Sequence, residues 1–222
     1  RMPPGSVKII SFDLDGTLVY RDHVDYFWLE LIPLLYAQRH GVDLDHARAI
    51  VLSEYDRIGE DDIRWYLPEY WLRRFDLKVS VKDALRSVRP LIRFKPGVFE
   101  VLPEVSKDYK LIIVSNASIE FIQLVLENMG ELRHIFSRVY SCVSNFCIPR
   151  KNEIFFRLIC QNMGIAPSEV LHLGDNPLYD LEIPRKIGIR AYLLSEGKQT
   201  QGEFVLCNLH ELPDILSRLS ST

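Results

Sequence analysis

Cysteine is scarce in this sequence, and the cysteines that are present do not form a metal-binding pattern. Cys142, Cys147, Cys160 and Cys207 include no C-x-x-C pair and have no neighbouring pair of histidines. Structural zinc sites need closely spaced ligands of this kind, so a zinc-binding domain has little support. We expect the four residues to be free, partly buried thiols in a reducing compartment.

Excess positive charge and long apolar runs are absent as well. The 27 Lys and Arg residues are outnumbered by 30 Asp and Glu residues, and no long basic block offers a local site for nucleic acid. No apolar stretch is long enough to cross a bilayer, and the N-terminal residues lack the pattern of a secretion signal. We therefore expect a cytoplasmic protein that binds neither nucleic acid nor membranes. The oligomeric state stays open.

Apolar residues are plentiful and follow two different patterns along the chain. They make up 47% of the 222 residues, enough for one full domain and a smaller unit. After residues 1–6, which are rich in Pro and Gly and are left out of the fold prediction, a short buried strand is predicted at 7–12. Residues 20–93 then place aromatic and aliphatic side chains at helical spacing, which predicts a separate helical insert.

Beyond Gly97 the pattern alternates between helix and strand. Helices are predicted at 98–106, 118–129, 152–163, 178–187 and from about 210, and strands at 110–114, 139–143, 170–173 and 190–194. Such alternation is typical of a three-layer α/β domain with a mostly parallel sheet. The predicted domains are residues 7–19 with 94–222, and the insert at 20–93.

Polar side chains that could act in catalysis or bind ligands follow four of these strands, at or just beyond their carboxyl ends. They are Asp13, Asp15, Ser115, Asn116, Lys151, Asp175 and Asp180. Open α/β sheets bind ligands at this edge, so we expect these residues to meet there. Several clustered carboxylates repel one another unless a cation neutralises them. Hard oxygen ligands without Cys or His favour Mg²⁺, and Lys151 would add further positive charge.

The order of these motifs resembles that of the haloacid dehalogenase superfamily. The segments DLDGT, SNA, the lysine ahead of an amphipathic helix, and GDNPLYD match its four motifs. The resemblance implies a Rossmann-like catalytic core in which the insert forms an α-helical cap. It also implies a phosphohydrolase in which Asp13 is the nucleophile that forms an aspartyl-phosphate. Asp15 is then the acid that protonates the leaving group and the base that activates water.

The same resemblance assigns ligands to the substrate and the metal. It implies that Thr17, Ser115, Asn116 and Lys151 bind the phosphate. Mg²⁺ would be held by the carboxylates of Asp13 and Asp175 and the backbone carbonyl of Asp15, with Asp180 supporting the site directly or through another ligand. One departure is that Asn152, where many relatives have Pro, follows the motif lysine. Arg150 is therefore a rival for the cationic role, although Asn152 as a helix cap favours Lys151.

Some residues near the motifs have simpler structural interpretations. Each motif alone could be an acidic turn, a strand-end hydroxyl, a helix cap or a solvated lysine, and only their joint placement favours a site. His172 lies inside a predicted strand, where a buried, hydrogen-bonded imidazole is expected. We interpret His23, near the start of the insert, as part of a solvated hinge rather than as a substrate contact. The insert aromatics should form its core, with one or two rings facing the cleft.

A cap over the site favours a small phosphorylated metabolite as substrate, such as phosphoglycolate or a sugar phosphate. A phosphomutase would share every motif, and the sequence does not separate the two activities. A dehalogenase needs neither Asp15 nor an acidic metal cluster, which argues against that activity. A non-catalytic binding protein would be expected to have lost the acidic set, yet Asp13, Asp15, Asp175 and Asp180 are all present.

Overall fold

A six-stranded sheet forms the centre of the protein in the computed structural model, which describes residues 5–197 and 202–221. The spatial order is β3-β2-β1-β4-β5-β6, and neighbouring strands pair in parallel. The strands are β1 (Ile9–Phe12), β2 (Lys110–Ser115), β3 (Phe136–Ser141), β4 (Val170–Gly174), β5 (Arg190–Leu194) and β6 (Val205–Leu206). This confirms the predicted parallel α/β class.

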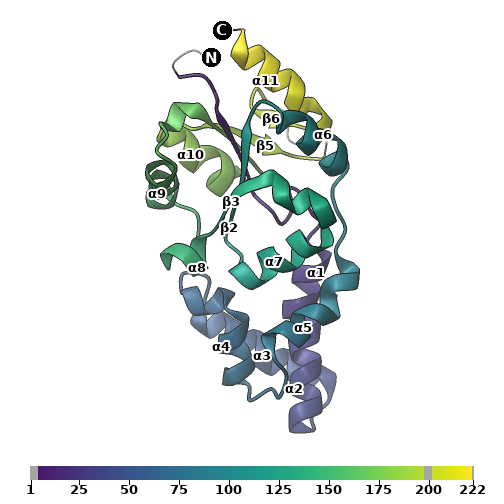
Figure 1. The fold of residues 1–222 in the computed structure, drawn as a ribbon. Coiled ribbons are helices and arrows are strands. Elements are labelled where there is room, and N and C mark those ends of the chain that lie inside the picture. Colours follow the sequence, from purple (N-terminus) through teal and green to yellow (C-terminus); the bar gives the residue numbers. More distant parts are fainter. Residues whose placement is uncertain (1–4, 198–201, 222) are drawn as a thin grey trace.

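Helices cover both faces of the sheet and create the three layers (Figure 1). Apolar side chains of α6 (Val98–Val105), α7 (Ile119–Asn128) and α11 (Leu212–Ser220) pack with one face of the strands. Those of α9 (Glu153–Met163), with residues that flank α10 (Ile183–Lys186), pack with the other face. Successive side chains of a strand point to opposite faces, so Ile10 belongs to the first cluster and Ile9 to the second.

Short helical turns complete this part of the chain. They are η4 (Gly130–Ile135), α8 (Cys142–Phe146), η5 (Pro167–Glu169), the π-helical segment η6 (Pro177–Glu182) and η7 (Leu209–Glu211). Helix α9 begins and ends as the sequence predicts. The Asn152 side chain accepts a hydrogen bond from the backbone N–H of Phe155 at 2.8 Å, and Gly164 closes the helix.

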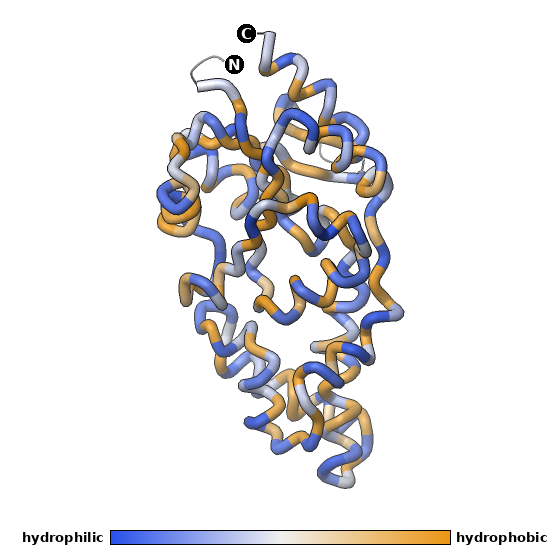
Figure 2. The backbone as a smooth tube through the Cα atoms, viewed as in Figure 1, coloured by the Kyte–Doolittle hydropathy of each residue, from blue (hydrophilic) through white to orange (hydrophobic). Residues whose placement is uncertain are grey.

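A bundle of helices lies between β1 and β2 in the sequence and extends from one end of the sheet domain (Figure 1). Its elements are α1 (Asp22–Tyr26), η1 (Phe27–Leu31), α2 (Ile32–His40), α3 (Leu44–Ile58), η2 (Ile63–Tyr66), α4 (Pro68–Arg74), α5 (Val81–Val88) and η3 (Arg89–Leu91). Along it, hydrophobic and hydrophilic residues alternate, whereas the central strands are mostly hydrophobic (Figure 2). Within the described ranges, no helix combines the length and apolar character needed to cross a membrane.

The bundle has its own apolar core, which continues onto the sheet domain. Phe27 and Trp71 are completely buried in it, and burial of a large apolar side chain contributes roughly 1.5–3 kcal/mol. Phe121 and Leu124 of α7 belong to the same cluster. The Phe27 and Phe121 rings meet edge to face with centroids 5.0 Å apart. Helix α7 therefore supports the sheet on one side and the bundle on the other.

The chain enters and leaves the bundle at neighbouring positions. Val19 and Phe94 form an antiparallel bridge. The Tyr20 N–H donates to the Arg93 carbonyl at 2.9 Å, and the Lys95 N–H donates to the Leu18 carbonyl at 2.8 Å. The crossing lies where the sequence places the start and end of the insert. The division at residues 19/20 and 93/94 stays a prediction.

The third and sixth strands differ from the sequence prediction. A strand was predicted at 139–143, but β3 ends at Ser141 and the chain turns into α8. The cause is local: the Ser141 side chain accepts a hydrogen bond from the Ser144 N–H at 3.0 Å, which begins a helix at Cys142. The two-residue edge strand β6 was not predicted, because so short a segment has no readable periodicity.

Candidate active site

The carboxyl ends of the central strands bring the predicted motifs together. Strand β1 lies between β2 and β4, and Phe12 is in register with Ile113 and Leu173. The chain beyond each of these residues therefore emerges at the same edge. The backbone N–H of Asp13 donates to the Leu173 carbonyl at 2.9 Å, which fixes the end of β1 against β4.

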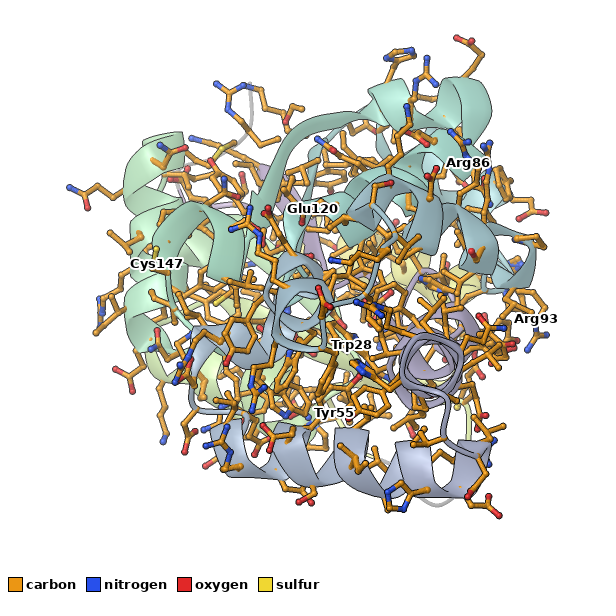
Figure 3. The ribbon with its side chains drawn as sticks, turned by 90° about the horizontal axis from the view of Figure 1, so that it is seen from below. Trp28, Tyr55, Arg86, Arg93, Glu120 and Cys147 are labelled. Carbon is orange, nitrogen blue, oxygen red and sulfur yellow. The ribbon has the colours of Figure 1, made fainter. Side chains whose placement is uncertain are left out.

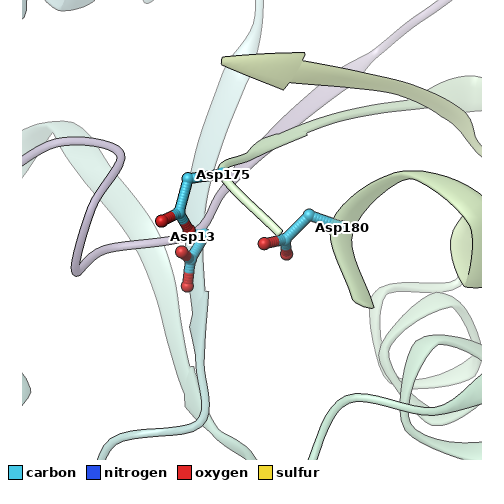
Figure 4. A group of neighbouring side chains, drawn as sticks. All are labelled: Asp13, Asp175 and Asp180. Carbon is cyan, nitrogen blue, oxygen red and sulfur yellow. The ribbon is translucent and has the colours of Figure 1, made fainter. Parts of the chain in front are cut away.

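Three carboxylates converge at this edge (Figure 4). Asp13, Asp175 and Asp180 each offer an oxygen, and these oxygens lie within 4.8 Å of one another. Burial, reinforced by the charge of Asp13, raises the pKa of Asp175 to about 8. A group of carboxylate oxygens whose negative charges repel one another suits a hard divalent cation. The Asp15 carboxylate lies outside this group, and a role for its backbone carbonyl stays a prediction.

Glycine at two positions allows this close approach. Gly16 has a φ of +87°, which favours glycine, and a Cβ there would overlap the Asp175 carboxylate. A Cβ on Gly174 would overlap the side chain of Asp180. Both glycines therefore let a carboxylate pack directly on the backbone of a neighbouring motif.

Lys151 is buried between two of the carboxylates. Its Nζ donates hydrogen bonds to Oδ1 of Asp13 at 2.8 Å and to Oδ1 of Asp180 at 2.7 Å. Burial opposes its charge, but the two carboxylates outweigh burial and raise the pKa of Lys151 above its ordinary value. Asn116 fixes the backbone here, since its Oδ1 accepts a hydrogen bond from the Lys151 N–H at 3.0 Å.

Arg150, the rival cation in the sequence, lines the same cavity as these carboxylates but forms its ion pairs with the helical bundle. Its guanidinium donates to Oε1 of Glu60 at 2.8 Å and also pairs with Asp61. Both acidic residues lie in the loop after α3, so this contact joins the bundle to the sheet domain. The structure thus separates the two neighbouring cations.

Asp180 is held by a chain of buried hydrogen bonds. Its Oδ1 meets Nε2 of His172 at 2.8 Å, and Nδ1 of His172 meets the hydroxyl of Ser11 at 2.9 Å. The Asn176 N–H donates to Oδ2 of Asp180 at 3.1 Å. Burial alone would raise the pKa of Asp180, but Lys151 and His172 outweigh it and lower the pKa below its usual range. The expectation of a buried, hydrogen-bonded His172 is confirmed.

Three other predicted site residues near Asp13 have different environments: Asp15, Thr17 and Ser115. Burial, followed by the charge of Asp13, raises the pKa of Asp15 to about 7. Thr17 is fully buried and donates a hydrogen bond to Oδ2 of Asp13 at 3.3 Å. It is not among the residues that line the adjacent cavity, and its predicted contact with substrate stays a prediction. Ser115 does line the cavity, and its hydroxyl oxygen accepts a hydrogen bond from the Ala117 N–H at 3.1 Å.

His23 lies against this loop, and the sequence interpretation of a solvated hinge residue is wrong. Its side chain has no exposed surface, and Nε2 is 3.6 Å from Oδ1 of Asp15. Asp22 and Asp25 on either side of it are exposed, but His23 is on the inner face of α1. No sequence pattern signals this burial, because a helix of five residues is too short to reveal which of its faces is covered.

A cavity of about 590 Å³ opens above the carboxylates, between the sheet domain and the bundle. Its floor includes Asp13, Asp15, Ser115, Asn116, Lys151, Asp175 and Asp180. The bundle side of the cavity includes four aromatic side chains, those of Trp28, Tyr55, Trp65 and Tyr66, together with charged and aliphatic ones. Seen from the bundle end, Trp28 and Tyr55 lie side by side near the middle of the molecule (Figure 3). Aromatic residues therefore face the cavity in larger number than the sequence suggested.

Comparison with known proteins gives consistent matches over most of the chain. The model of one protein family, the haloacid dehalogenase-like hydrolases, matches residues 7–188. A GMP/IMP nucleotidase of Escherichia coli is 23% identical over 185 residues, which cover 83% of this chain and 81% of that protein. An N-acetylmuramic acid 6-phosphate phosphatase of Pseudomonas aeruginosa is 26% identical over an alignment covering 96% of each.

Solved structures agree on the fold. The crystal structure of a haloacid dehalogenase-type phosphatase from Thermococcus onnurineus superposes with a TM-score of 0.80 and 22% identity. The superposition covers 95% of this chain and 98% of that one. At this level of identity the likeness establishes the architecture, including the helical bundle beside the sheet domain.

Proposed function

The chain belongs to the haloacid dehalogenase-like hydrolase family, and from this premise we propose that it is a magnesium-dependent phosphatase of small phosphorylated molecules. The observation that carries the proposal is the position of Asp13. Its carboxylate sits on the floor of a covered cavity, beside Lys151 and within reach of Asp175 and Asp180. A nucleophile, positive charge and metal ligands therefore share one pocket.

The donor set fits Mg²⁺. It consists of carboxylate oxygens, without thiolate or imidazole. Burial raises the pKa of Asp175, and the negative charges of Asp13 and Asp180 raise it further. Asp13, Asp175 and Asp180 would hold the ion, with the Asp15 carbonyl as a further candidate. When bound, Mg²⁺ supplies positive charge that offsets the repulsion between these carboxylates and an anionic phosphate.

Phosphoryl transfer begins at Asp13. One oxygen of its carboxylate forms a bond to phosphorus while the bond from phosphorus to the ester oxygen breaks, which leaves an aspartyl-phosphate. Lys151 donates a hydrogen bond to Asp13 and would stabilise negative charge on the nucleophile and on the transferring group. The hydroxyl of Ser115 and the N–H of Asn116 would donate to the phosphate oxygens.

Asp15 donates a proton in the first half-reaction and accepts one in the second. Its raised pKa, about 7, allows it to donate a proton to the departing ester oxygen near neutral pH. The resulting carboxylate then accepts a proton from the water that attacks phosphorus. The bond between phosphorus and Asp13 breaks, and inorganic phosphate leaves. The sequence of steps returns both carboxyl groups to their starting states.

The cavity favours a substrate larger than phosphoglycolate. Pockets of roughly 300–1,000 Å³ enclose most of the surface of a drug-sized ligand, and this one is near 590 Å³. Its aromatic residues Trp28, Trp65 and Tyr66 suit a flat or partly apolar group beyond the phosphate. A nucleoside monophosphate fits this description, and one relative is named for GMP and IMP. A phosphorylated sugar is the second candidate, and another relative is named for one.

A screen of phosphorylated metabolites tests the proposal. Purified protein is given nucleoside monophosphates, sugar phosphates and phosphoglycolate, with Mg²⁺ or with EDTA, and released phosphate is measured. The proposal expects release that needs both Mg²⁺ and Asp13, so that Asp13→Asn is inactive. Isomerised sugar phosphate without free phosphate would identify a phosphomutase instead. No turnover of any ester, or turnover unchanged in EDTA, would contradict the proposal.

A further inference from the structure

The buried imidazole of His23 is not used by the reaction described above, and it lies next to Asp15. Its Nε2 is 3.6 Å from Oδ1 of Asp15, roughly 0.5 Å longer than an ordinary N–H···O hydrogen bond. Neither side chain has freedom to turn toward solvent, since His23 is fully buried and Asp15 is 9% exposed.

The unpaired polar atoms of the described residues concentrate at this contact. Within residues 5–197 and 202–221, four buried side-chain atoms lack a hydrogen-bond partner: Oδ1 of Asp15, both ring nitrogens of His23, and Oγ of Ser118. Three of the four belong to one pair of facing side chains. Buried polar groups are almost always paired in folded proteins, so such a concentration needs an explanation.

We propose that His23 is a positioning residue that fixes the carboxyl group of Asp15 through Nε2, so that the Asp15 oxygen facing the cavity meets the ester oxygen of the substrate. The inference rests on the proposed function, because it assigns His23 a part in the proton transfers of Asp15. It adds a residue that no motif of the sequence identified for this purpose.

The state of the ring suits this role. Burial, followed by the charge of Arg21, lowers the pKa of His23 to about 4. The ring is therefore neutral and carries one N–H and one bare nitrogen. A neutral imidazole can donate to a carboxylate or, as the other tautomer, accept from a carboxylic acid. It can thus hold Asp15 in both halves of the reaction.

The location of His23 also links the two parts of the molecule. Asp15 belongs to the loop that follows β1, whereas His23 is in α1, the first helix of the bundle. Its neighbour Val24 is part of the apolar core of the bundle. A shift of α1 would therefore move the Nε2 atom relative to Asp15.

The test compares two esters that differ in their need for an acid. p-Nitrophenyl phosphate has a leaving group that departs without a proton, whereas benzyl phosphate releases an alcohol that needs one. Single-turnover release of p-nitrophenol and of benzyl alcohol, with Mg²⁺ present, reports the first half-reaction alone. A misplacement of about 1 Å costs about 10²-fold in rate, so His23→Phe should lose about 10- to 100-fold with benzyl phosphate. Its release of p-nitrophenol should match the wild type.

Two polar variants separate positioning from packing. The amide nitrogen of His23→Gln can occupy the place of Nε2, and that of His23→Asn the place of Nδ1. The inference expects Gln to retain most of the benzyl phosphate rate and Asn to lose it. Equal behaviour of the two, or equal loss with both esters in all variants, would overturn it. This comparison also decides the matter if His23→Phe fails to fold.

Asp15→Asn separates failure of this inference from failure of the proposed function. If Asp15→Asn releases benzyl alcohol at the wild-type rate, Asp15 is not the acid, and the proposed function needs revision. If Asp15→Asn is impaired and His23→Phe is not, only the role of His23 is refuted.

Discussion

Nζ of Lys151 lies 2.8 Å from Oδ1 of Asp13, and both side chains are almost completely buried. A buried ammonium group is costly unless it is paired, and here it also neutralises the proposed nucleophile. We therefore expect the same contact to matter for both stability and chemistry. Asp180 lies on the other side of Lys151 and is also hydrogen-bonded to His172, so it keeps one partner if Lys151 is removed.

Replacement of Lys151 should damage folding as well as activity. In Lys151→Met, Asp13 and Asp180 lose their shared cation, and removal of one partner of a buried pair costs about 3–5 kcal/mol. Urea unfolding in EDTA measures this change. Lys107→Met, at an exposed lysine, is the control and should change the free energy of unfolding by less than about 0.5 kcal/mol. Equal stability of the two variants would argue against the buried pair.

Replacement of Arg150 should affect substrate binding more than stability. Its partners Glu60 and Asp61 are largely exposed, and such pairs contribute about 0–1 kcal/mol. They join the bundle to the sheet domain beside the cavity, so we expect Arg150→Ala to raise KM severalfold with little change in kcat. Arg57→Ala, which removes an exposed pair within the bundle, should leave KM unchanged. A large loss of kcat in Arg150→Ala would instead support Arg150 as the catalytic cation.

Trp65 should favour substrates that carry a nucleobase. Stacking of a nucleobase on an aromatic side chain is worth about 1–3 kcal/mol, so Trp65→Ala should lower kcat/KM for GMP about 5- to 150-fold. The value for ribose 5-phosphate, which has no base, should not change. Tyr26→Ala is a suitable control because Tyr26 is exposed and does not line the cavity. Similar losses for both substrates would contradict a base-binding role.

Mg²⁺ affinity should rise with pH in the metal-free protein. Burial and neighbouring charge raise the pKa of Asp15 to about 7 and that of Asp175 to about 8. At pH 6, Asp175 is protonated and must release its proton before it can bind the ion, so binding tightens as the pH approaches 8. Calorimetric titration at pH 6, 7 and 8, in two buffers of different ionisation enthalpy, measures affinity and proton release together. Equal affinity at pH 6 and pH 8 would contradict the expectation.

Much of the core was readable from the sequence because its signals are local. The strand Arg190–Leu194 and the capped helix after Asn152 are short patterns with definite ends, and the structure confirms them. The meeting of the strand-end motifs followed from one rule, that parallel strands place their carboxyl ends at the same edge. Asp13, Asp175 and Asp180 meet there, although the roles given to them stay predictions.

Other features depend on tertiary contacts that no local pattern encodes. The ion pairs of Arg150 are made with Glu60 and Asp61, about 90 positions away. The burial of His23 depends on how α1 packs on the loop after β1. The predicted end of β3 is wrong because the residues from Val139 to Val143 have the pattern of a strand. The Ser141 cap starts a helix at Cys142 instead.

Trapping the covalent intermediate tests the central claim most directly. Asp15→Asn should still accept the phosphoryl group from p-nitrophenyl phosphate, whose leaving group needs no proton, but should hydrolyse the product slowly. After a rapid acid quench, peptide mass spectrometry is predicted to find one phosphoryl group on the peptide that contains Asp13, and none when Asp13→Asn is added. A phosphoryl group on another residue, or p-nitrophenol release by the double variant at the rate of Asp15→Asn alone, would contradict the account.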